Sequence, residues 1–234
     1  MIAPNRRKTR IVPVGKMLIG GGHPIVVQSM TSVKTEDVAA TMEQIRRLAA
    51  AGCEIVRVAI PNADALAALP SVIAASPLPV VCDIHYDAAL AFGSLAAGAH
   101  KIRINPGNLG SARTRDSQFK EILKAAKDIG AAVRIGVNSG SLEKDLLDKY
   151  RHPTPEALAD SALRWLAAAS AAGAEDIVVV SIKSSDACVL VESNRILATA
   201  CDSPLHVGLT EAGDAPYGSI KSAEIGRASW RERV

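Results

Sequence analysis

Four alanine-rich segments of the sequence each end in a glycine, and this repeated pattern constrains the fold more than any other feature. The glycines are Gly52, Gly98, Gly130 and Gly173, in the contexts AAAGCE, LAAGAH, KDIGAA and AAAGAE. Glycine adopts a positive φ without strain, so it is common just after the C-terminus of a helix. A run rich in β-branched residues follows each glycine: EIVRVAI, KIRIN, AVRIGV and DIVVVSI. Helices that alternate with such strands predict β-α units and a parallel sheet.

Three further runs, IVVQSM, LPVVCDIHY and PLHVGLTEAG, bring the expected strands to seven. We place these strands at residues 25–30, 54–60, 79–86, 101–106, 132–138, 176–183 and 204–211. The leading segment TRIVPVGKMLIGGGHP is expected to form a β-hairpin before the first of them. One helix is expected to begin at Thr35, a suitable N-cap, and another at Pro155, which fits the first turn of a helix.

Seven consecutive β-α units favour an α/β fold of the (β/α)8 TIM-barrel type, truncated after about the seventh strand. An open doubly wound sheet is the alternative. No G-x-G-x-x-G motif opens any of the expected helices, and GGGHP at 20–24 precedes a strand. The barrel is therefore preferred to a dinucleotide-binding sheet.

The composition excludes several classes of protein. A formal charge of +3 and 3% aromatic residues do not suggest a nucleic-acid-binding protein. No apolar stretch approaches the ~20 residues of a membrane helix, and no apolar run follows the basic N-terminus. We therefore expect no membrane association and a cytoplasmic location. The cysteines (Cys53, Cys82, Cys188 and Cys201) form no C-x-x-C pair, so the sequence predicts no disulfide framework and no metal site in this chain.

Polar side chains recur at the ends of the expected strands. In a parallel barrel all strand C-termini open onto one face, where active sites of this fold lie. Arg57, Arg103, Arg134 and Lys183 would then converge there, and like charges repel one another in a poorly solvated site unless an anion is present. Guanidinium groups match phosphate oxygens in pairs, so a ligand with more than one phosphate is the natural counter-charge. Asn105, Asn138 and Ser181 are further polar residues at the ends of the same strands.

Three further groups are candidates for acid–base chemistry: Asp83, His85 and Glu211. Asp83 and His85 are two residues apart on one strand and therefore share a face. For His85 alone, a structural histidine is the preferred interpretation, and its position beside Asp83 at a strand end narrows that preference. His206 begins the seventh expected strand, at the end opposite the site, and is given no role.

The resemblance to a known family rests on seven motifs. They are QSMT (28–31), EIVRVAIP (54–61), DIHYD (83–87), KIRINPGN (101–108), VRIGVNSGSLEKDLLDKY (133–150), SIKSSD (181–186) and HVGLTEAG (206–213). In this order they resemble the 4-hydroxy-3-methylbut-2-enyl diphosphate synthases, also called the GcpE or IspG family. The similarity runs from about Arg7 to Ala223.

The resemblance implies an enzyme of non-mevalonate isoprenoid biosynthesis. Family members reduce 2-C-methyl-D-erythritol 2,4-cyclodiphosphate with electrons from flavodoxin or ferredoxin, through a [4Fe-4S] cluster in a C-terminal domain of a homodimer. By the resemblance, Arg57, Arg103, Arg134 and Lys183 bind the diphosphate, with Asn105, Asn138 and Ser181 nearby. Asp83 and His85 line the pocket, and Glu211 donates a proton during dehydration.

The end of the sequence departs from the family. Residues 1–223 are interpreted as an incomplete substrate-binding barrel, and EIGRASWRERV at 224–234 as a tail unrelated to the family. The iron–sulfur domain is expected to be absent, so this chain alone is predicted to bind no cluster and to be inactive. A cofactor-free barrel transferase of the dihydropteroate-synthase type is the competing interpretation, and a non-catalytic binding module is a third.

Overall fold

The computed structural model describes the backbone of residues 7–85, 87–109 and 114–231, and side chains as far as residue 225. Residue 86, at the end of one expected strand, lies outside this range, as do the last three residues of the predicted tail. Six parallel strands form one curled sheet in the order β3-β4-β5-β6-β7-β8. They span Gln28–Met30 (β3), Ile55–Ile60 (β4), Val80–Ile84 (β5), Lys101–Ile104 (β6), Ala132–Asn138 (β7) and Val178–Lys183 (β8).

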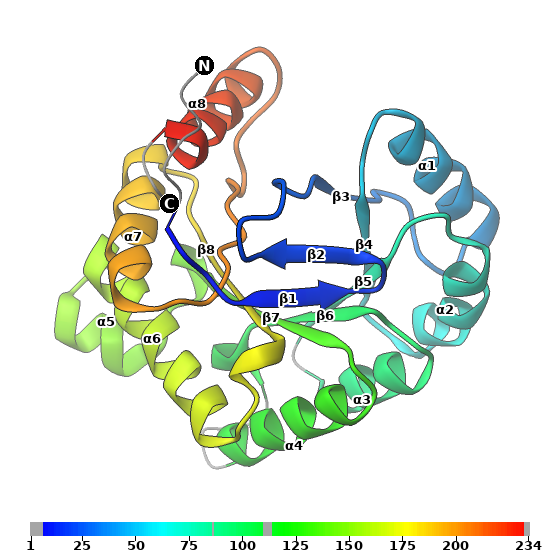
Figure 1. Ribbon diagram of the computed structural model, residues 1–234, viewed down its shortest axis with the longest axis horizontal. Coiled ribbons are helices and arrows are strands. Elements are labelled where there is room, and N and C mark those ends of the chain that lie inside the picture. Colours follow the sequence, from blue (N-terminus) through cyan, green and yellow to red (C-terminus); the bar gives the residue numbers. More distant parts are fainter. Residues whose placement is uncertain (1–6, 86, 110–113, 232–234) are drawn as a thin grey trace.

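Helices follow the strands and form the outer layer (Figure 1). They are α1 (Val38–Ala50), α2 (Ala63–Ala75), α3 (Ala88–Ala96), α4 (Arg115–Asp128), α5 (Lys144–Tyr150), α6 (Pro155–Ala171), α7 (Ala187–Ala200) and α8 (Tyr217–Arg231). Short 3-10 turns cover Pro106–Asn108 (η1), Ser139–Ser141 (η2) and Glu175–Ile177 (η3). The main apolar core lies between this layer and the sheet, with Phe119 and Trp165 packed edge to face at 5.2 Å between ring centroids.

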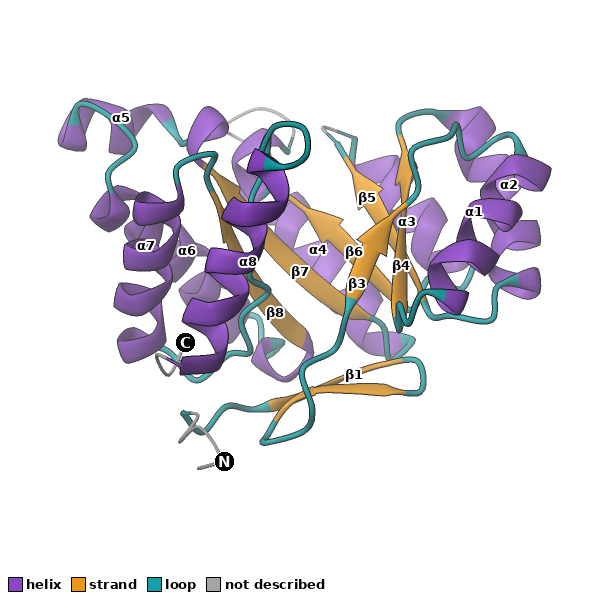
Figure 2. Cartoon of the chain, turned by 90° about the horizontal axis from the view of Figure 1, so that it is seen from above, coloured by secondary structure: helices purple, strands orange, loops and turns teal. Residues whose placement is uncertain are grey.

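The expected hairpin is present and closes one end of the sheet. Strands β1 (Ile11–Val14) and β2 (Met17–Gly20) pair antiparallel. Val12 and Val14 are fully buried in a second apolar cluster, against Ile55, Val81, Ala132 and Val179. Figure 2 shows the hairpin lying across the N-terminal ends of the parallel strands. The hairpin does not cover the opposite end of the sheet, where the parallel strands finish.

The four glycines of the repeated pattern behave as expected. Gly52, Gly98, Gly130 and Gly173 have φ of 89°, 90°, 71° and 65°, and each directly follows the end of a helix or its cap. The helix start at Pro155 is also confirmed. The predicted N-cap at Thr35 is wrong: Asp37 caps α1 by accepting from Ala40 N at 3.0 Å. Thr35 is instead buried, and its hydroxyl donates to the Ala59 carbonyl at 2.6 Å.

The seventh expected strand is the main correction to the fold. Residues 204–211 run beside β8 but form only one bridge, Val180 to Leu205. His206 N donates to Val180 O at 2.8 Å, and Thr210 N donates to Ser184 O at 3.3 Å. A regular ladder does not form because Pro204 has no N–H to donate and Gly208 favours extended pairing weakly. Five other strands are shorter than expected, and β7 has the expected bounds. β3 begins at Gln28, β4 begins at Ile55, and η3 occupies 175–177 before β8. β5 covers 80–84 in place of 79–86, and β6 ends at Ile104.

Within the described ranges, no helix is both long and apolar enough to cross a membrane.

Candidate functional site

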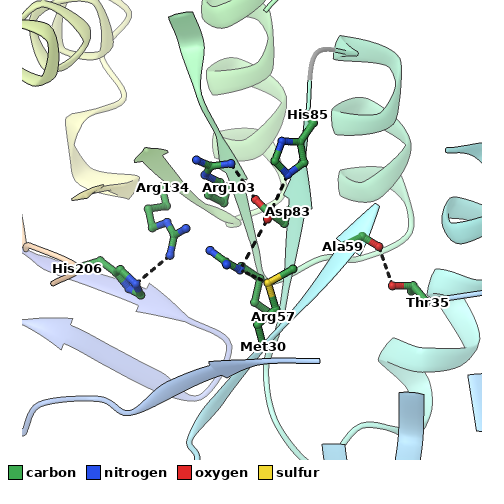
Figure 3. Close-up of polar contacts among 9 residues, drawn as sticks. All are labelled: Met30, Thr35, Arg57, Ala59, Asp83, His85, Arg103, Arg134 and His206. Atoms are coloured by element: carbon green, nitrogen blue, oxygen red, sulfur yellow. Dashed lines mark hydrogen bonds and ion pairs between the residues drawn. The ribbon is translucent and has the colours of Figure 1, made fainter. Parts of the chain in front are cut away.

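Asp83, near the end of β5, is the centre of a cluster of cationic side chains. Its carboxylate lies 3.2 Å from Arg103 Nη1, 3.8 Å from Arg57 Nε and 3.3 Å from His85 Nε2. These groups come from β4, β5, the residue after β5, and β6 (Figure 3). Asp83 and Arg103 are 4% and 5% exposed, so water screens this ion pair little.

The strand register explains why these side chains meet. Asp83 is the Cα partner of Arg103, and Arg103 is the partner of Arg134 on the next strand. Neighbouring partners in a parallel sheet point to the same face, so all three side chains enter the interior. Gly136 on β7 makes room for them, because a Cβ added there would lie 2.6 Å from Arg103 Nε. The predicted convergence of Arg57, Arg103 and Arg134 is therefore what the structure has.

Arg134 is 1% exposed and has a partner that sequence reasoning missed. Its Nη1 donates to His206 Nε2 at 3.0 Å (Figure 3). Because His206 accepts this bond, its ring is neutral and carries its proton on Nδ1. Burial, then the charges of Arg134, Lys101 and Lys183, lower the pKa of His206 well below its usual value. His206 was given no role because it was expected at the start of a strand, at the end opposite the site. Pro204 and Gly208 were the signals in the sequence that this strand would be irregular.

Lys183 and Ser181 lie at the end of β8. Lys183 adds a cationic side chain to the site, and Ser181 adds a hydroxyl. Burial, followed by the charges of Arg134, Arg57 and Arg103, lowers the pKa of Lys183 to about 7. Ser181 is 1% exposed, and its hydroxyl has no hydrogen-bond partner among the described residues. Both side chains therefore have unused hydrogen-bonding capacity in the interior.

Asn105 and Asn138 organise the loops above the cluster. The Asn105 amide donates to Ser141 Oγ at 2.8 Å, and its oxygen accepts from Gly107 N at 3.1 Å, which fixes the turn that follows β6. With its amide oriented to suit its neighbours, Asn138 donates to Val137 O and accepts from Arg103 Nη2, both at 3.1 Å. Asn138 thus holds the Arg103 guanidinium at Nη2, and Asp83 holds it at Nη1.

The charge state of Asp83 limits what it can do chemically. Burial by itself would raise its pKa, but the hydrogen bond from His85 and the charges of Arg57 and Arg103 outweigh burial. The pKa of Asp83 consequently lies well below its usual value. Asp83 is a permanent anion near neutral pH, which suits a counter-ion and positioning group better than a proton donor.

Glu211 lies apart from the ion-pair cluster. It is exposed and has a φ of 50°, an uncommon conformation for a non-glycine residue. No hydrogen bond or ion pair joins it to Arg57, Arg103 or Arg134 in the part of the chain that the structure describes. Thr210 beside it is bonded to the segment after β8, so Glu211 follows the same strand end as Lys183.

A cavity of about 420 Å³ lies beside this cluster, between β3, β8, residues 204–209 and the hairpin. Polar and charged residues from four segments line it, among them Gln28, Lys101, Lys183 and His206. Arg57, Asp83, Arg103 and Arg134 do not line this cavity. Lys183 and His206 connect it to the guanidinium cluster, since His206 bonds to Arg134 and the charges of the arginines act on Lys183.

The described residues do not fit an iron–sulfur cluster. Within them, no group of three or more His, Cys, Asp or Glu side chains is arranged to hold a metal ion. Cys53 and Cys82 are buried, Cys188 is exposed on α7, and Cys201 follows that helix. Burial raises the pKa of Cys82 to about 12, which disfavours the thiolate that metals require.

Comparisons with known proteins support the fold. Solved structures of low sequence identity share the fold: a dihydropteroate synthase from Xanthomonas albilineans has a TM-score of 0.59 and 13% identity, covering 95% of this chain and 87% of that one. The HMG-CoA lyase from Brucella melitensis has a TM-score of 0.59 and 15% identity, covering 88% and 79%. These likenesses concern the fold alone.

Sequence relatives are far more similar. The 4-hydroxy-3-methylbut-2-en-1-yl diphosphate synthase (flavodoxin) of Aquifex aeolicus (strain VF5) is 54% identical over 218 residues, which are 93% of this chain and 60% of the relative. The protein of the same name from Sulfurihydrogenibium sp. (strain YO3AOP1) is 52% identical, covering 94% and 61%. The chain thus spans about three-fifths of the length of these curated relatives. The GcpE TIM-barrel domain model matches residues 9–227. The resemblance drawn from the motifs is confirmed, and the chain belongs to the GcpE family.

Proposed function

We propose that this chain is the substrate-binding barrel of a 4-hydroxy-3-methylbut-2-enyl diphosphate synthase and that it binds 2-C-methyl-D-erythritol 2,4-cyclodiphosphate. The whole reaction is a two-electron reduction with ring opening and loss of water. The observation that carries the proposal is the convergence of Arg57, Arg103 and Arg134 on one interior site with a single carboxylate, Asp83. A diphosphate supplies the negative charge that this site lacks.

The cations are assigned to the two phosphates. Arg57 and Arg103 share Asp83 in the unliganded chain, so each keeps N–H groups for phosphate oxygens. Lys183 offers a point charge from β8, and the free hydroxyl of Ser181 lies two residues before it. Asn105 and Asn138 keep the neighbouring loops and Arg103 in position. The family resemblance supports the same set.

The acid–base roles follow the family resemblance and the local geometry. Glu211 is proposed as the proton donor for the departing hydroxyl, since it is an exposed carboxyl near the strand end that carries Lys183. His85, with a side chain 43% exposed, is proposed to contact the substrate, while Asp83 orients His85 and the two arginines. Electrostatic positioning of this kind is a large part of catalysis on phosphorylated substrates.

Partners are proposed from the names of the relatives. Those names specify flavodoxin, and we propose flavodoxin, or ferredoxin in its place, as the electron donor. A [4Fe-4S] cluster and a homodimer are proposed for the longer family protein, with the cluster held by residues other than those described. A cytoplasmic location stays a prediction.

Calorimetric titration tests the substrate assignment. The chain is expected to bind the cyclic diphosphate at one site, and to bind a pterin diphosphate at least tenfold more weakly. The reverse preference would favour a transferase of the dihydropteroate-synthase type. The support for that alternative is limited to the shared barrel fold. Arg103→Met should reduce affinity for the cyclic diphosphate at least tenfold, whereas Arg46→Met, on an exposed face of α1, should not change it.

A further inference from the structure

Lys101, at the start of β6, is a buried cation that the proposed diphosphate site does not use. Its side chain is 0% exposed, and its Nζ has no hydrogen-bond partner among the described residues. It is two residues before Arg103 on the same strand, so both side chains enter the interior. Its strand partners are Val81 and Ala132, and neither can hydrogen-bond to an ammonium through its side chain.

The charges around Lys101 are unfavourable. Burial, then the charges of Arg134 and Arg57, lowers the pKa of Lys101 to about 7. The charge of Lys101 also lowers the pKa of His206. Below it, the hairpin contributes the apolar side chains of Val12 and Val14. Asp83 pairs with Arg57, Arg103 and His85, and not with Lys101.

A buried ammonium without a partner destabilises a fold, and a neutral side chain of similar length would fill the same space. The fold therefore does not account for Lys101. A role in the cavity accounts for it, because Lys101 lines the cavity together with Lys183, His206 and Gln28. Gln28 Oε1 is also buried without a partner. His206 Nε2 is engaged by Arg134, which leaves the Nδ1–H of the neutral ring as a donor.

We infer that Lys101, Lys183 and His206, which line the cavity together, form a second anion subsite beside the guanidinium cluster. Its ligand is a phosphoryl group, and inorganic diphosphate is the simplest probe of it. The identity of the natural ligand rests on the proposed function, in which this subsite would receive one of the two phosphates of the cyclic diphosphate.

Anion binding at this subsite should take up protons. A bound phosphoryl group stabilises the charged form of Lys101 and raises its pKa from about 7 toward the usual 10.5. Lys183 responds in the same direction, and Arg57, Arg134, Arg103 and Asp83 keep their charges. Of the other ionisable residues that line the cavity, Arg7 donates to the Ser203 carbonyl, and His23 lies at the hairpin. Affinity should therefore rise as the pH falls from 9.5 to 7.

The test compares Lys101→Met with Lys124→Met, a change of the same chemistry at an exposed position on α4. Binding of inorganic diphosphate and of the cyclic diphosphate is measured by calorimetry at pH 8 in two buffers of different ionisation enthalpy. Thermal unfolding is measured without ligand. Lys101→Met is expected to weaken both ligands at least tenfold, to reduce proton uptake and to raise the melting temperature. Lys124→Met should match the original chain in all three.

Two results would overturn the inference. One is affinity within twofold of the original chain in Lys101→Met. The other is weaker binding together with a lower melting temperature, which would make Lys101 a structural residue. The proposed function fails separately: if the original chain binds inorganic diphosphate through Lys101 but not the cyclic diphosphate, the subsite stands and the substrate assignment falls. If it binds neither ligand, both fall.

Discussion

At the scale of single residues, one carboxylate holds the site together in the absence of ligand. Asp83 contacts two guanidinium groups and one imidazole within 3.8 Å. Removing one partner of a buried ion pair costs more than the pair contributes, because the other charge remains buried and unpaired. Two anions can therefore neutralise the arginines: Asp83, which belongs to the chain, and a bound ligand.

Asp83→Asn tests this arrangement. The amide has the same shape but no charge, so Arg57 and Arg103 lose their counter-ion. Chemical denaturation should show a loss of about 3 kcal/mol of unfolding free energy. Inorganic diphosphate should raise the melting temperature of the variant more than that of the original chain, because it replaces the missing charge. Asp128→Asn, at the exposed end of α4, should change neither quantity, and equal stability of the two variants would refute the role given to Asp83.

Gly136 tests the placement of Arg103. In Gly136→Ala the new Cβ would lie 2.6 Å from Arg103 Nε, so the guanidinium must move away from Asp83. We expect a loss of about 1–3 kcal/mol in unfolding free energy and weaker binding of diphosphate by calorimetry. Gly140→Ala is the matched control, since a Cβ there meets nothing within 4 Å. Wild-type affinity in Gly136→Ala would show that Arg103 does not need its present position.

Side-chain direction was the part of the site that the sequence predicted well. Strands have a period of two, so Arg103 and Asn105 were expected to share a face. The parallel order placed Arg134 beside Arg103 and turned Arg57 to the same face, through the register of β4, β5 and β6. The sequence did not reveal that Asp83 already neutralises part of this charge, nor that His206 reaches Arg134. Both contacts depend on distances across the interior, between residues 20 and 72 positions apart, which no local pattern encodes.

At the scale of elements, the hairpin is the floor of the barrel. Its first strand, β1, alternates exposed and buried residues, with Ile11 at 48% exposure and Val12 at 0%. The alternation and the central VPVGKM turn made the hairpin predictable. Residues 204–211 were not, because the alternation of Leu205, Val207 and Leu209 matches a strand while Pro204 and Gly208 limit the ladder. The helix cap at Asp37 was missed because Thr35, two residues earlier, is an equally good capping residue by type.

Val12→Ala measures what the hairpin contributes. The valine is fully buried against Ile55, Val81, Ala132 and Val179, so losing two methyl groups should cost about 2 kcal/mol of unfolding free energy. Ile11→Ala removes more carbon from the neighbouring exposed position and should cost less than about 0.5 kcal/mol. Urea denaturation of the pair decides the matter: similar losses would mean that the hairpin does not pack as the floor.

At the scale of the whole molecule, positive charge in the interior couples stability to pH. Lys101 and Lys183 have pKa values lowered to about 7 in the folded chain, against 10.5 when unfolded. Between these values the unfolded state binds more protons than the folded state, so the unfolding free energy rises with pH. Below pH 7 both states are protonated, and this dependence disappears.

Urea denaturation at pH 7 and pH 9 should therefore show higher stability at pH 9. Lys101 alone can contribute up to about 1.4 kcal/mol per pH unit, and Lys101→Met should remove that share of the slope. Lys124→Met should keep it. A stability that falls between pH 7 and pH 9, or a slope unaffected by Lys101→Met, would contradict the charge states assigned to the interior.

A crystal structure of this chain with 2-C-methyl-D-erythritol 2,4-cyclodiphosphate is the most direct measurement of the central claim. We predict one bound molecule in the interior, with phosphate oxygens within hydrogen-bond distance of Arg57, Arg103 and Arg134 together. A ligand bound elsewhere, or one that touches a single arginine while the other two stay with Asp83 and His206, would contradict it.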